Sequence, residues 1–461
     1  MAKSSQVRIM GMSLSEFAHG YLSTTLGKVS LALFIILIGT SIYAAVVIPP
    51  NFGEIWNVPT NWEIYPKDAP PVWLNAFTGN TYAPEIIINS VKEASSSITI
   101  SFSVYNDYKK PWNDLFIILK PPLSGISMVA YITVDRPDGS SLRIGPVQLG
   151  SGTTEIGTMY QVEGQIIQFY ASKYGYALNI PVGSSAFPYI FMSVVNDVVK
   201  PLYGKYTITI TLIPASGSLP SLGNSKPVEV AMEGTAYGLM GTDTIGHDLW
   251  LGLLAGFPIS LEIGVVYALL VTVIAVGVGL AAGFIGGIID EILTRITDLV
   301  ILIPSFVILV VLSILLHLNI WDAMLYLAVL AWGGSARIIR SISMQIRTAT
   351  YIDLARASGA SNLWILRNHV LPQITPYILY LLVVNVPGAI LTLSSLNFLN
   401  LAGVSYPTWG TILYYAEEYG ALETGMWWWV IPPGILITLV AVTFIVTALA
   451  IEPIVNPRLR R

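Results

Sequence analysis

"FPISLEIGVVYALLVTVIAVGVGLAAGF", residues 257–284, contains a single charged side chain, Glu262. About 20 mostly apolar residues in a helix are enough to cross the hydrocarbon core of a bilayer, so this run predicts a membrane-spanning helix. Five further runs have the same character, at residues 29–47, 299–318, 321–339, 374–396 and 428–450. The sequence therefore predicts an α-helical polytopic membrane protein with six transmembrane helices.

The composition of the whole chain agrees with this prediction. Of its 461 residues, 54% are hydrophobic and only 11% are charged, and the mean hydropathy is +0.67. Soluble domains are usually about 25% charged, so much of this chain is expected to face lipid. The sequence has no cysteine, which excludes a disulfide framework and a thiolate metal site. A net charge of -4, with no basic stripe, gives no reason to expect a nucleic-acid partner.

The first apolar run, residues 29–47, has two interpretations. Basic residues precede it, as they do in a signal peptide, but it is long for a signal core and no small-residue cleavage site follows "VVIPPNF". We expect an uncleaved first transmembrane helix that follows a cytoplasmic segment, residues 1–28.

The basic residues predict how the chain is oriented in the cell membrane. Positively charged residues gather in cytoplasmic loops near the membrane. Lys3, Arg8 and Lys28 precede the first predicted helix, and "NPRLRR" ends the chain. Five arginines follow the fourth predicted helix, at positions 337, 340, 347, 356 and 367. We therefore expect both termini and this arginine-rich segment to be cytoplasmic.

The same orientation places a long segment outside the cell membrane, between the first two helices. Unstructured loops longer than about 15 residues are uncommon, so a folded domain is expected there. Stretches such as "KYTITITLIPAS" (residues 205–216) alternate apolar and polar residues, and "RPDG" (residues 136–139) is a strong turn signal. The sequence predicts an extracytoplasmic β-rich domain, resembling a small sandwich, at residues 51–233.

The chemistry of this β-rich domain is not evident from its sequence. We find no His, Asp and Glu at metal-ligand spacing and no nucleophile motif in it. Fold class alone implies no function. We expect it to help a partner protein to dock, or to protect the chain, without binding the solute itself.

"DLARASGASNLWILRNHVLP", residues 353–372, is a polar stretch between two apolar runs. Asp353 near a helix start complements the helix dipole, Gly359 allows a turn, and Pro372 either ends a helix or opens the next one. Small residues at 355, 357 and 360 leave a thin surface that another protein could approach. An ordinary amphipathic connector and a docking knob are both compatible with these features.

This stretch resembles the EAA motif of bacterial and archaeal ABC importer permeases. Asp353 stands where that motif has Glu, Leu354 replaces the first Ala, and Ala355, Gly359, Leu371 and Pro372 match. In the family, the motif forms coupling helices that sit in a cleft of an ATPase subunit. The resemblance implies an ATPase-coupling role for Asp353, Ala355, Ala357, Gly359, Ala360, Leu371 and Pro372.

A second motif is similar to one in the C-type subunit of the dipeptide/oligopeptide/nickel permeases. "GTDTIGHD", residues 241–248, resembles the external GTDxxGRD signature, with His247 in place of Arg. "SLNFL" at 395–399 and "PTWG" at 407–410 also match the family. The resemblance implies a permease core at residues 241–461 and signature roles for Gly241, Thr242, Asp243, Gly246 and Asp248.

The resemblance implies a transport subunit that is not an enzyme and binds neither a cofactor nor a metal. The sequence has no GxxxxGK[ST] loop, so it lacks that means of holding a nucleotide phosphate. The expected partners are a homologous second permease, two ATPase subunits that bind ATP and Mg, an extracytoplasmic solute-binding protein and the lipid bilayer. The chain would form half of a pore for peptides, or for oligosaccharides. The alternative is a membrane-anchored receptor or enzyme acting through the outer β domain.

Two groups of polar residues near the predicted helices have two readings each. Amides and hydroxyls follow the fifth helix at Asn385, Thr392, Ser394, Ser395 and Asn397. They either line a translocation path or form hydrogen bonds between helices. The charged residues Asp290, Glu291, Arg295 and Asp298 flank the short inner turn expected between the second and third helices. They are either solvated charges at the membrane edge, which is the simpler reading, or part of a contact with an ATPase.

Overall fold

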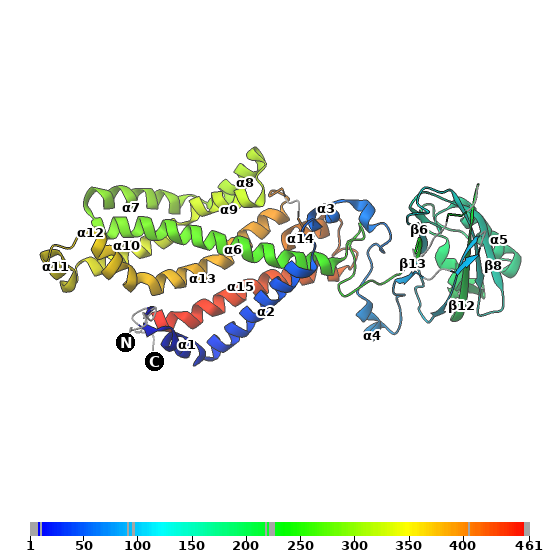
Figure 1. The fold of residues 1–461 in the computed structure, drawn as a ribbon, viewed down its shortest axis with the longest axis horizontal. Helices are drawn as coiled ribbons and strands as arrows, with labels where there is room; N and C mark the ends of the chain where they lie inside the picture. The colour runs from blue at the N-terminus through cyan, green and yellow to red at the C-terminus, as the bar shows by residue number, and fades with distance from the viewer. Residues whose placement is uncertain are drawn as a thin grey trace. The chain divides into compact units, whose positions relative to one another are not determined.

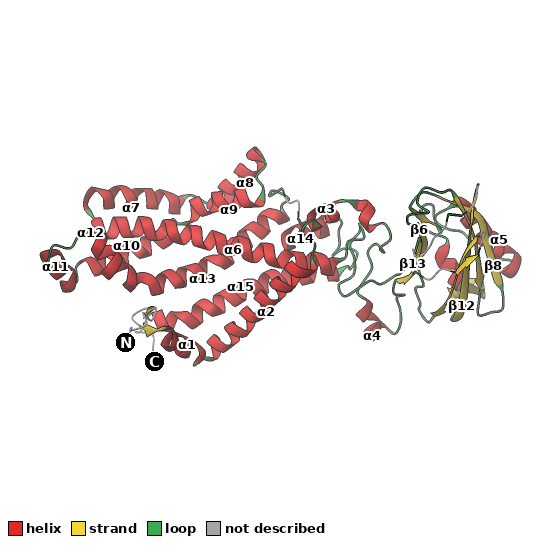
Figure 2. Cartoon of the chain, in the orientation of Figure 1, coloured by secondary structure: helices red, strands yellow, loops and turns green. Residues whose placement is uncertain are grey.

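The computed structural model describes residues 8–9, 12–89, 92–94, 97–216, 219–220, 226–403 and 406–455. Lys3 and the basic end "NPRLRR", which supported the predicted orientation, lie outside these residues. The chain divides into two compact units, a helical unit of residues 1–57 and 251–461 and a β-rich unit of residues 58–250 (Figure 1). Figure 2 shows that the long helices belong to one unit and the two large sheets to the other, while a two-stranded sheet of β1 (Arg8–Ile9) and β2 (Met12–Ser13) lies in the helical unit.

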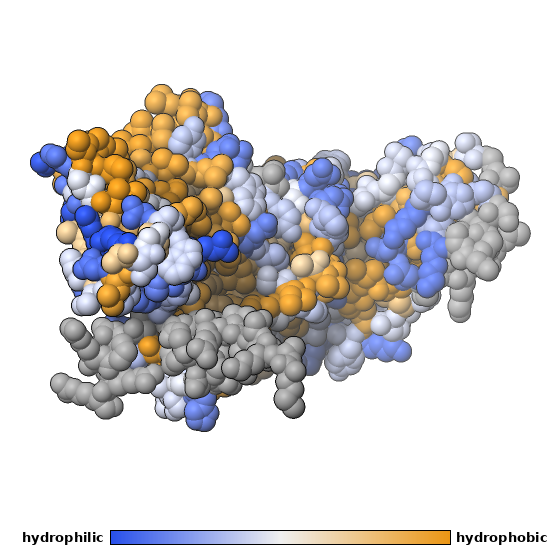
Figure 3. Space-filling model, turned by 60° about the vertical axis from the view of Figure 1, so that its left-hand side comes forward, coloured by the Kyte–Doolittle hydropathy of each residue, from blue (hydrophilic) through white to orange (hydrophobic). Residues whose placement is uncertain are grey.

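Four helical stretches in the described part of the helical unit are long and apolar enough to cross a membrane. They are Thr25–Val47, Leu249–Ile285, Asn362–Phe398 and Trp427–Ile454. Figure 3 shows apolar residues over much of the visible surface of this unit, as expected for a surface that faces lipid. The helices in chain order are α1 (Leu14–Leu22), α2 (Thr25–Val47), α3 (Phe52–Asn57), α6 (Leu249–Leu280), α7 (Gly287–Leu302), α8 (Ser305–Leu316), α9 (Ile320–Ala331), α10 (Gly333–Arg347), α11 (Thr350–Ala357), α12 (Asn362–Ile365), α13 (Leu371–Phe398), α14 (Trp409–Glu418) and α15 (Trp427–Val455).

The third and fourth predicted helices are each broken. The run at 299–318 crosses the break between α7 and α8, which meet at 74°, and the run at 321–339 crosses the break between α9 and α10, which meet at 41°. Pro304 explains the first break, because a proline disfavours helical geometry at the residue before it, and Ile303 is extended (φ -75°, ψ 122°). The described chain therefore has six candidate spans only if each bent pair counts as one.

Two short π-helical turns, Ala281–Ile285 and Leu366–Val370, extend α6 and precede α13. At Gly283 the chain approaches α10 so closely that a Cβ atom would collide with the carbonyl of Arg340. The end of α6 is thus held against α10. The turn expected between the second and third helices is reduced to Gly286, so the charged residues at 290–298 lie on helix α7 and not beside a loop.

The β-rich unit contains two antiparallel sheets, of strand order β4-β5-β12-β7-β8 and β3-β13-β6-β9. Alternation along the strands buries Ile208, Ile210 and Leu212 of β12 in one core with Leu115 and Ile117 of β6. The core therefore joins both sheets, as predicted for a sandwich. The strands are β3 (Ile86–Ile88), β4 (Lys92–Ala94), β5 (Ser97–Asn106), β6 (Asp114–Leu119), β7 (Met128–Asp135), β8 (Ser141–Leu149), β9 (Thr153–Glu155), β12 (Gly204–Pro214) and β13 (Val228–Glu233), with a hairpin of β10 (Met192–Val195) and β11 (Val198–Pro201).

The longest helix of the β-rich unit has no counterpart in the sequence-based prediction, and neither has the short α4 (Asn75–Thr78). Helix α5 (Tyr160–Tyr174) buries Val162, Ile166 and Tyr170 in the core of the sandwich. These positions recur at helical spacing, which is the signal that could have revealed it. The unit runs from Val58 to Trp250, so it begins after the predicted start at residue 51 and extends beyond the predicted end at residue 233, while α3 belongs to the helical unit.

Candidate functional site

The stretch at 353–372 forms two short helices separated by a turn. Helix α11 ends at Ala357, Gly359 adopts a left-handed conformation (φ +83°), and α12 begins at Asn362. The left-handed region suits glycine because it has no Cβ atom. The Ser361 hydroxyl accepts a hydrogen bond from the Trp364 backbone N–H and caps α12. Pro372 is the second residue of α13 and directly follows the π-helical turn Leu366–Val370.

A small apolar cluster anchors this segment to the helical bundle. Ile352, Ile365 and Val370 are fully buried and pack with Phe284 from the end of α6. The Arg356 guanidinium lies 5.5 Å from the centre of the Phe284 ring, within the range of a cation–π contact. The segment at 353–372 therefore packs directly against the end of α6, so a displacement of the segment would also displace α6.

The outer surface of the segment exposes apolar side chains. Leu354, Leu363 and Trp364 are 64%, 77% and 50% exposed. Asp353, Ala357 and Gly359 are also exposed, whereas Ala355 and Ala360 are half-buried. Figure 1 shows α11 and α12 at the end of the bundle opposite α3 and α14. An apolar surface among charged and small residues, at the end of the bundle, is what a protein partner would cover. We call this surface, made of Leu354, Leu363 and Trp364, the apolar cap.

Ion pairs join α7 to α10 near this end of α6. Arg340 donates from Nε and Nη2 to the two carboxylate oxygens of Asp290, at 2.5 and 2.8 Å, and Arg337 pairs with Asp298. A two-pronged pair of this kind fixes geometry as well as charge. Asp290 and Asp298 therefore connect two helices through ion pairs whose side chains are still partly exposed.

The five signature residues at 241–248 come together in one hydrogen-bonded loop of the β-rich unit. Asp243 Oδ1 accepts hydrogen bonds from the backbone N–H groups of residues 245, 246 and 247, and Oδ2 pairs with His247 Nδ1 at 2.6 Å. Thr242 Oγ1 accepts from the Ala69 N–H, and Asp248 Oδ1 from the Trp250 N–H. Gly246 is left-handed (φ +100°), and Gly241 also has a positive φ. These contacts indicate a rigid, internally satisfied loop.

His247, where the sequence departs from the family signature, is buried in this loop. Its ring packs edge-to-face on Trp62, with 5.2 Å between the ring centres. Only 3% of the residue is exposed. The imidazole lies between the Asp243 carboxylate and the Trp62 ring, which is how the loop accommodates a histidine at this position.

The structure separates the polar residues of α13 instead of gathering them on one face. Asn385 donates to Thr272 of α6 at 3.5 Å, and buried Asn397 donates to Thr408 at 3.1 Å. Ser395 bonds back to the Leu391 carbonyl in its own helix, and Ser394 lines a small void with α6. Hydrogen bonds between segments thus account for Asn385 and Asn397. Thr392 is half-buried and Ser395 is exposed.

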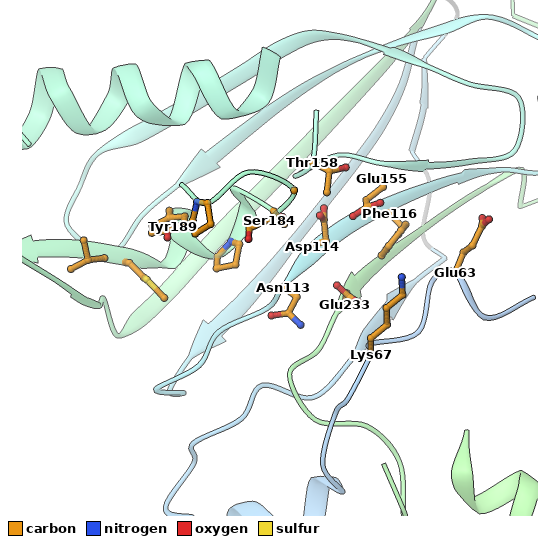
Figure 4. Close-up of a pocket in the computed structure, with 16 residues that line it drawn as sticks. Glu63, Lys67, Asn113, Asp114, Phe116, Glu155, Thr158, Ser184, Tyr189 and Glu233 are labelled. Atoms are coloured by element: carbon orange, nitrogen blue, oxygen red, sulfur yellow. The ribbon is translucent and has the colours of Figure 1, made fainter. Parts of the chain in front are cut away.

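Sequence reasoning missed a cavity of about 660 Å³ in the β-rich unit. Its carboxylates come from residues 63, 114, 155 and 233, which lie far apart along the chain (Figure 4). Strand pairing brings three of them together, and Glu63 follows a 3-10 turn at Pro59–Trp62, so no local motif marks the group. Among the described residues, no group of three His, Asp or Glu side chains could hold a metal ion.

Comparison with known proteins assigns the helical unit. A family described as the binding-protein-dependent transport system inner membrane component matches residues 275–461. The dipeptide transport system permease protein DppC of Bacillus subtilis (strain 168) is 32% identical over 223 residues, which are 48% of this chain and 69% of that protein. The chain belongs to this family of ABC transporter permeases. The oligopeptide transport system permease protein OppC of the same organism is 31% identical to this permease over 223 residues. These residues are 48% of this permease and 72% of OppC.

The family match covers the part of the permease that carries the apolar cap. It begins within α6 and includes α11, α12 and α13, but it does not include the β-rich unit at 58–250. A solved structure, the MetNI methionine ABC transporter in inward-facing conformations, is 23% identical over 46% of the permease and 98% of that chain, with a TM-score of 0.34. Because the family match does not include the β-rich unit, this unit and its cavity are interpreted from their own geometry.

Proposed function

We propose that this permease forms half of the pore of an ATP-driven importer, beside a second, similar permease subunit, and that its cargo is peptides. The names of its relatives support the cargo, since both are permeases of dipeptide or oligopeptide transport systems. An extracytoplasmic solute-binding protein would deliver the peptide. ATP and Mg would bind to two separate ATPase subunits, and this chain would bind neither.

The apolar cap is the observation that carries this proposal. Leu354, Leu363 and Trp364 are exposed on a segment whose other side is anchored by buried Ile352 and Ile365. The segment also carries Asp353 and Arg356, and charged groups are rare on lipid-facing helices. A surface of this kind suits a cytoplasmic protein better than it suits lipid. We assign it to an ATPase subunit, and the exposed turn at Gly359 would enter the contact.

The packing suggests how ATP could drive the pore between two states. Closure of the ATPase pair would move α11 and α12, and the contact of Ile352 and Ile365 with Phe284 would pass that movement to α6. The Arg340–Asp290 pair would make α7 and α10 follow, because a two-pronged ion pair resists shear. Alternating access would then result from two packings of the helices.

Replacing one apolar residue of the cap tests the docking directly. Leu363→Glu places a charge in the centre of the proposed contact, and we expect at least a tenfold loss of ATPase co-purification, because an unpaired buried charge is costly. Co-purification is measured by pull-down of the permease from membranes. Tyr160→Glu is the matched control, since Tyr160 is 89% exposed on α5, outside the cap. Equal recovery of the ATPases with Leu363→Glu and Tyr160→Glu would show that the cap is a plain connector.

A further inference from the structure

The cavity of the β-rich unit lies on the outer face of the four-stranded sheet. Along β6, Leu115 and Ile117 point into the core, so Asp114 and Phe116 occupy the opposite face. Glu233 of β13 pairs directly with Asp114, and Glu155 of β9 pairs with Phe116. Residues that face each other across an antiparallel pair share one side of the sheet. Strand register alone therefore directs three carboxylates to one place, as Figure 4 shows.

Asp114 at the base of the cavity has one carboxylate oxygen without a hydrogen bond. Its Oδ1 accepts from the backbone N–H groups of Leu115 and Gly157, both at 2.6 Å. Its Oδ2 is buried and makes no hydrogen bond with any described residue, although the Ser185 hydroxyl is close enough to lower the pKa of the carboxyl. The whole residue is 0% exposed. A buried acceptor without a donor is costly, and a ligand that donates a hydrogen bond would remove that cost.

The rest of the lining favours a cation with an apolar body. The cavity contains four carboxylates, of Glu63, Asp114, Glu155 and Glu233, and a single amine, of Lys67. Phe116, Tyr189 and Met192 supply apolar wall. A volume of about 660 Å³ is far larger than a metal ion needs and falls in the usual range for a small organic molecule.

We propose that this cavity binds small molecules that carry a primary ammonium group, and that the carboxylates of Asp114 and Glu233 receive that group. An ammonium donates three hydrogen bonds, which suits acceptors that come from neighbouring strands. The group could belong to the amino terminus of a short peptide or to a simple amine, and the choice of a peptide rests on the proposed function. The docking role expected from the sequence alone does not account for this cavity.

The pKa values of the two carboxyls give the site a pH dependence. Burial raises the pKa of Asp114 to about 7, and burial together with Asp114 and Glu155 raises that of Glu233 to about 8. Glu63, Glu155, Lys67 and Tyr189 are the other titratable groups that line the cavity. Below these pKa values the carboxyls are neutral and attract a cation weakly. An alkylammonium such as ethylammonium, with a pKa of about 10, keeps its charge over this range. Its affinity should therefore fall at least tenfold from pH 8.5 to pH 6, as the two carboxyls become neutral.

Calorimetric titration of the full chain in lipid nanodiscs tests the proposal with three probes. They are trialanine with a free amino terminus, N-acetyl-trialanine and ethylammonium. We expect acetylation to weaken binding at least tenfold, because it removes the charge and two of the donors. If trialanine binds tightly and ethylammonium binds weakly, the natural ligand is a peptide. If the two probes bind with comparable affinity, the natural ligand is a simple amine. Equal binding of the two peptides, or no binding of any probe, would overturn the proposal.

Variants place the binding in the cavity. Glu233→Gln and Asp114→Asn should each lower the affinity for trialanine at least tenfold, whereas Asp197→Asn should leave it unchanged. Asp197 is an exposed carboxylate in the β10–β11 turn, outside the cavity. A cooperative thermal unfolding transition shows that each variant is folded. If Asp114→Asn does not fold, Glu233→Gln still tests the site. Unchanged affinity in a folded Glu233→Gln variant would contradict the site.

The result stays separate from the proposed transport function. Peptide uptake by the assembled transporter, together with absence of binding in the cavity, would overturn this inference alone. Binding of trialanine in the cavity, without peptide uptake by any assembly, would overturn the peptide cargo and leave the ammonium site intact.

Discussion

At the scale of single residues, Asp243 organises more of the signature loop than any neighbour. Its carboxylate accepts three backbone N–H groups and pairs with His247 while only 2% of the residue is exposed. Removing it would leave these donors buried without an acceptor. We predict that Asp243→Ala costs about 3 kcal/mol of folding free energy, seen as a lower midpoint of thermal unfolding of the purified chain.

An exposed carboxylate of the same unit provides the comparison. Asp107 makes an exposed hydrogen bond with Asn80 at 3.0 Å, so Asp107→Ala should change stability by less than about 0.5 kcal/mol. Similar unfolding midpoints for Asp243→Ala and Asp107→Ala would show that the loop is held by packing on Trp62 and not by the carboxylate.

Single residues also show where sequence reasoning ends. Gly359 and Pro372 could be assigned to a turn and to a helix start because their backbone chemistry is local. Asp114 and Glu233 could not be paired, because only the register of β6 and β13 makes them neighbours. Asp243 could be recognised in a motif, but its contact with a buried His247 depends on the tertiary fold.

At the scale of elements, hydropathy located every apolar run but not the breaks within two of them. The Pro304 signal was available in the sequence, yet the apolar residues continue on both sides of it, so the run was predicted as one helix. At the break between α9 and α10, Gly333 lies so close to α7 that a Cβ atom would be 2.8 Å from Ile301 Cγ1. Such packing cannot be foreseen from hydropathy.

The predicted orientation of the elements can be tested with single cysteines, because the natural chain has none. The arginines of α10 and α11 predict that this end of the bundle is cytoplasmic, and the β-rich unit should then be outside. In intact cells, a membrane-impermeant maleimide should label Ser151→Cys, an exposed position beside β9, and should label Ser358→Cys only after permeabilisation. Labelling in the reverse order would overturn the proposed orientation.

At the scale of the whole molecule, the chain contains a helical unit that carries the family match and a β-rich unit that lies outside this match. The helical unit carries the family match and the apolar cap, and the β-rich unit carries a cavity lined by carboxylates. The sequence alone predicted both units and the transport class, because hydropathy and motifs are local signals. It could not reveal the cavity, which strand pairing creates.

The most direct test of the central claim is uptake of labelled trialanine into proteoliposomes. The permease is reconstituted with its partner permease, the two ATPases and the solute-binding protein. We predict uptake that requires ATP, and that falls at least tenfold with Leu363→Glu but not with Tyr160→Glu, because the charge in the cap separates the pore from its ATPases. Peptide uptake that continues without ATP, or an assembled complex that hydrolyses ATP and admits no peptide, would contradict the assignment of this chain to an ATP-driven peptide importer.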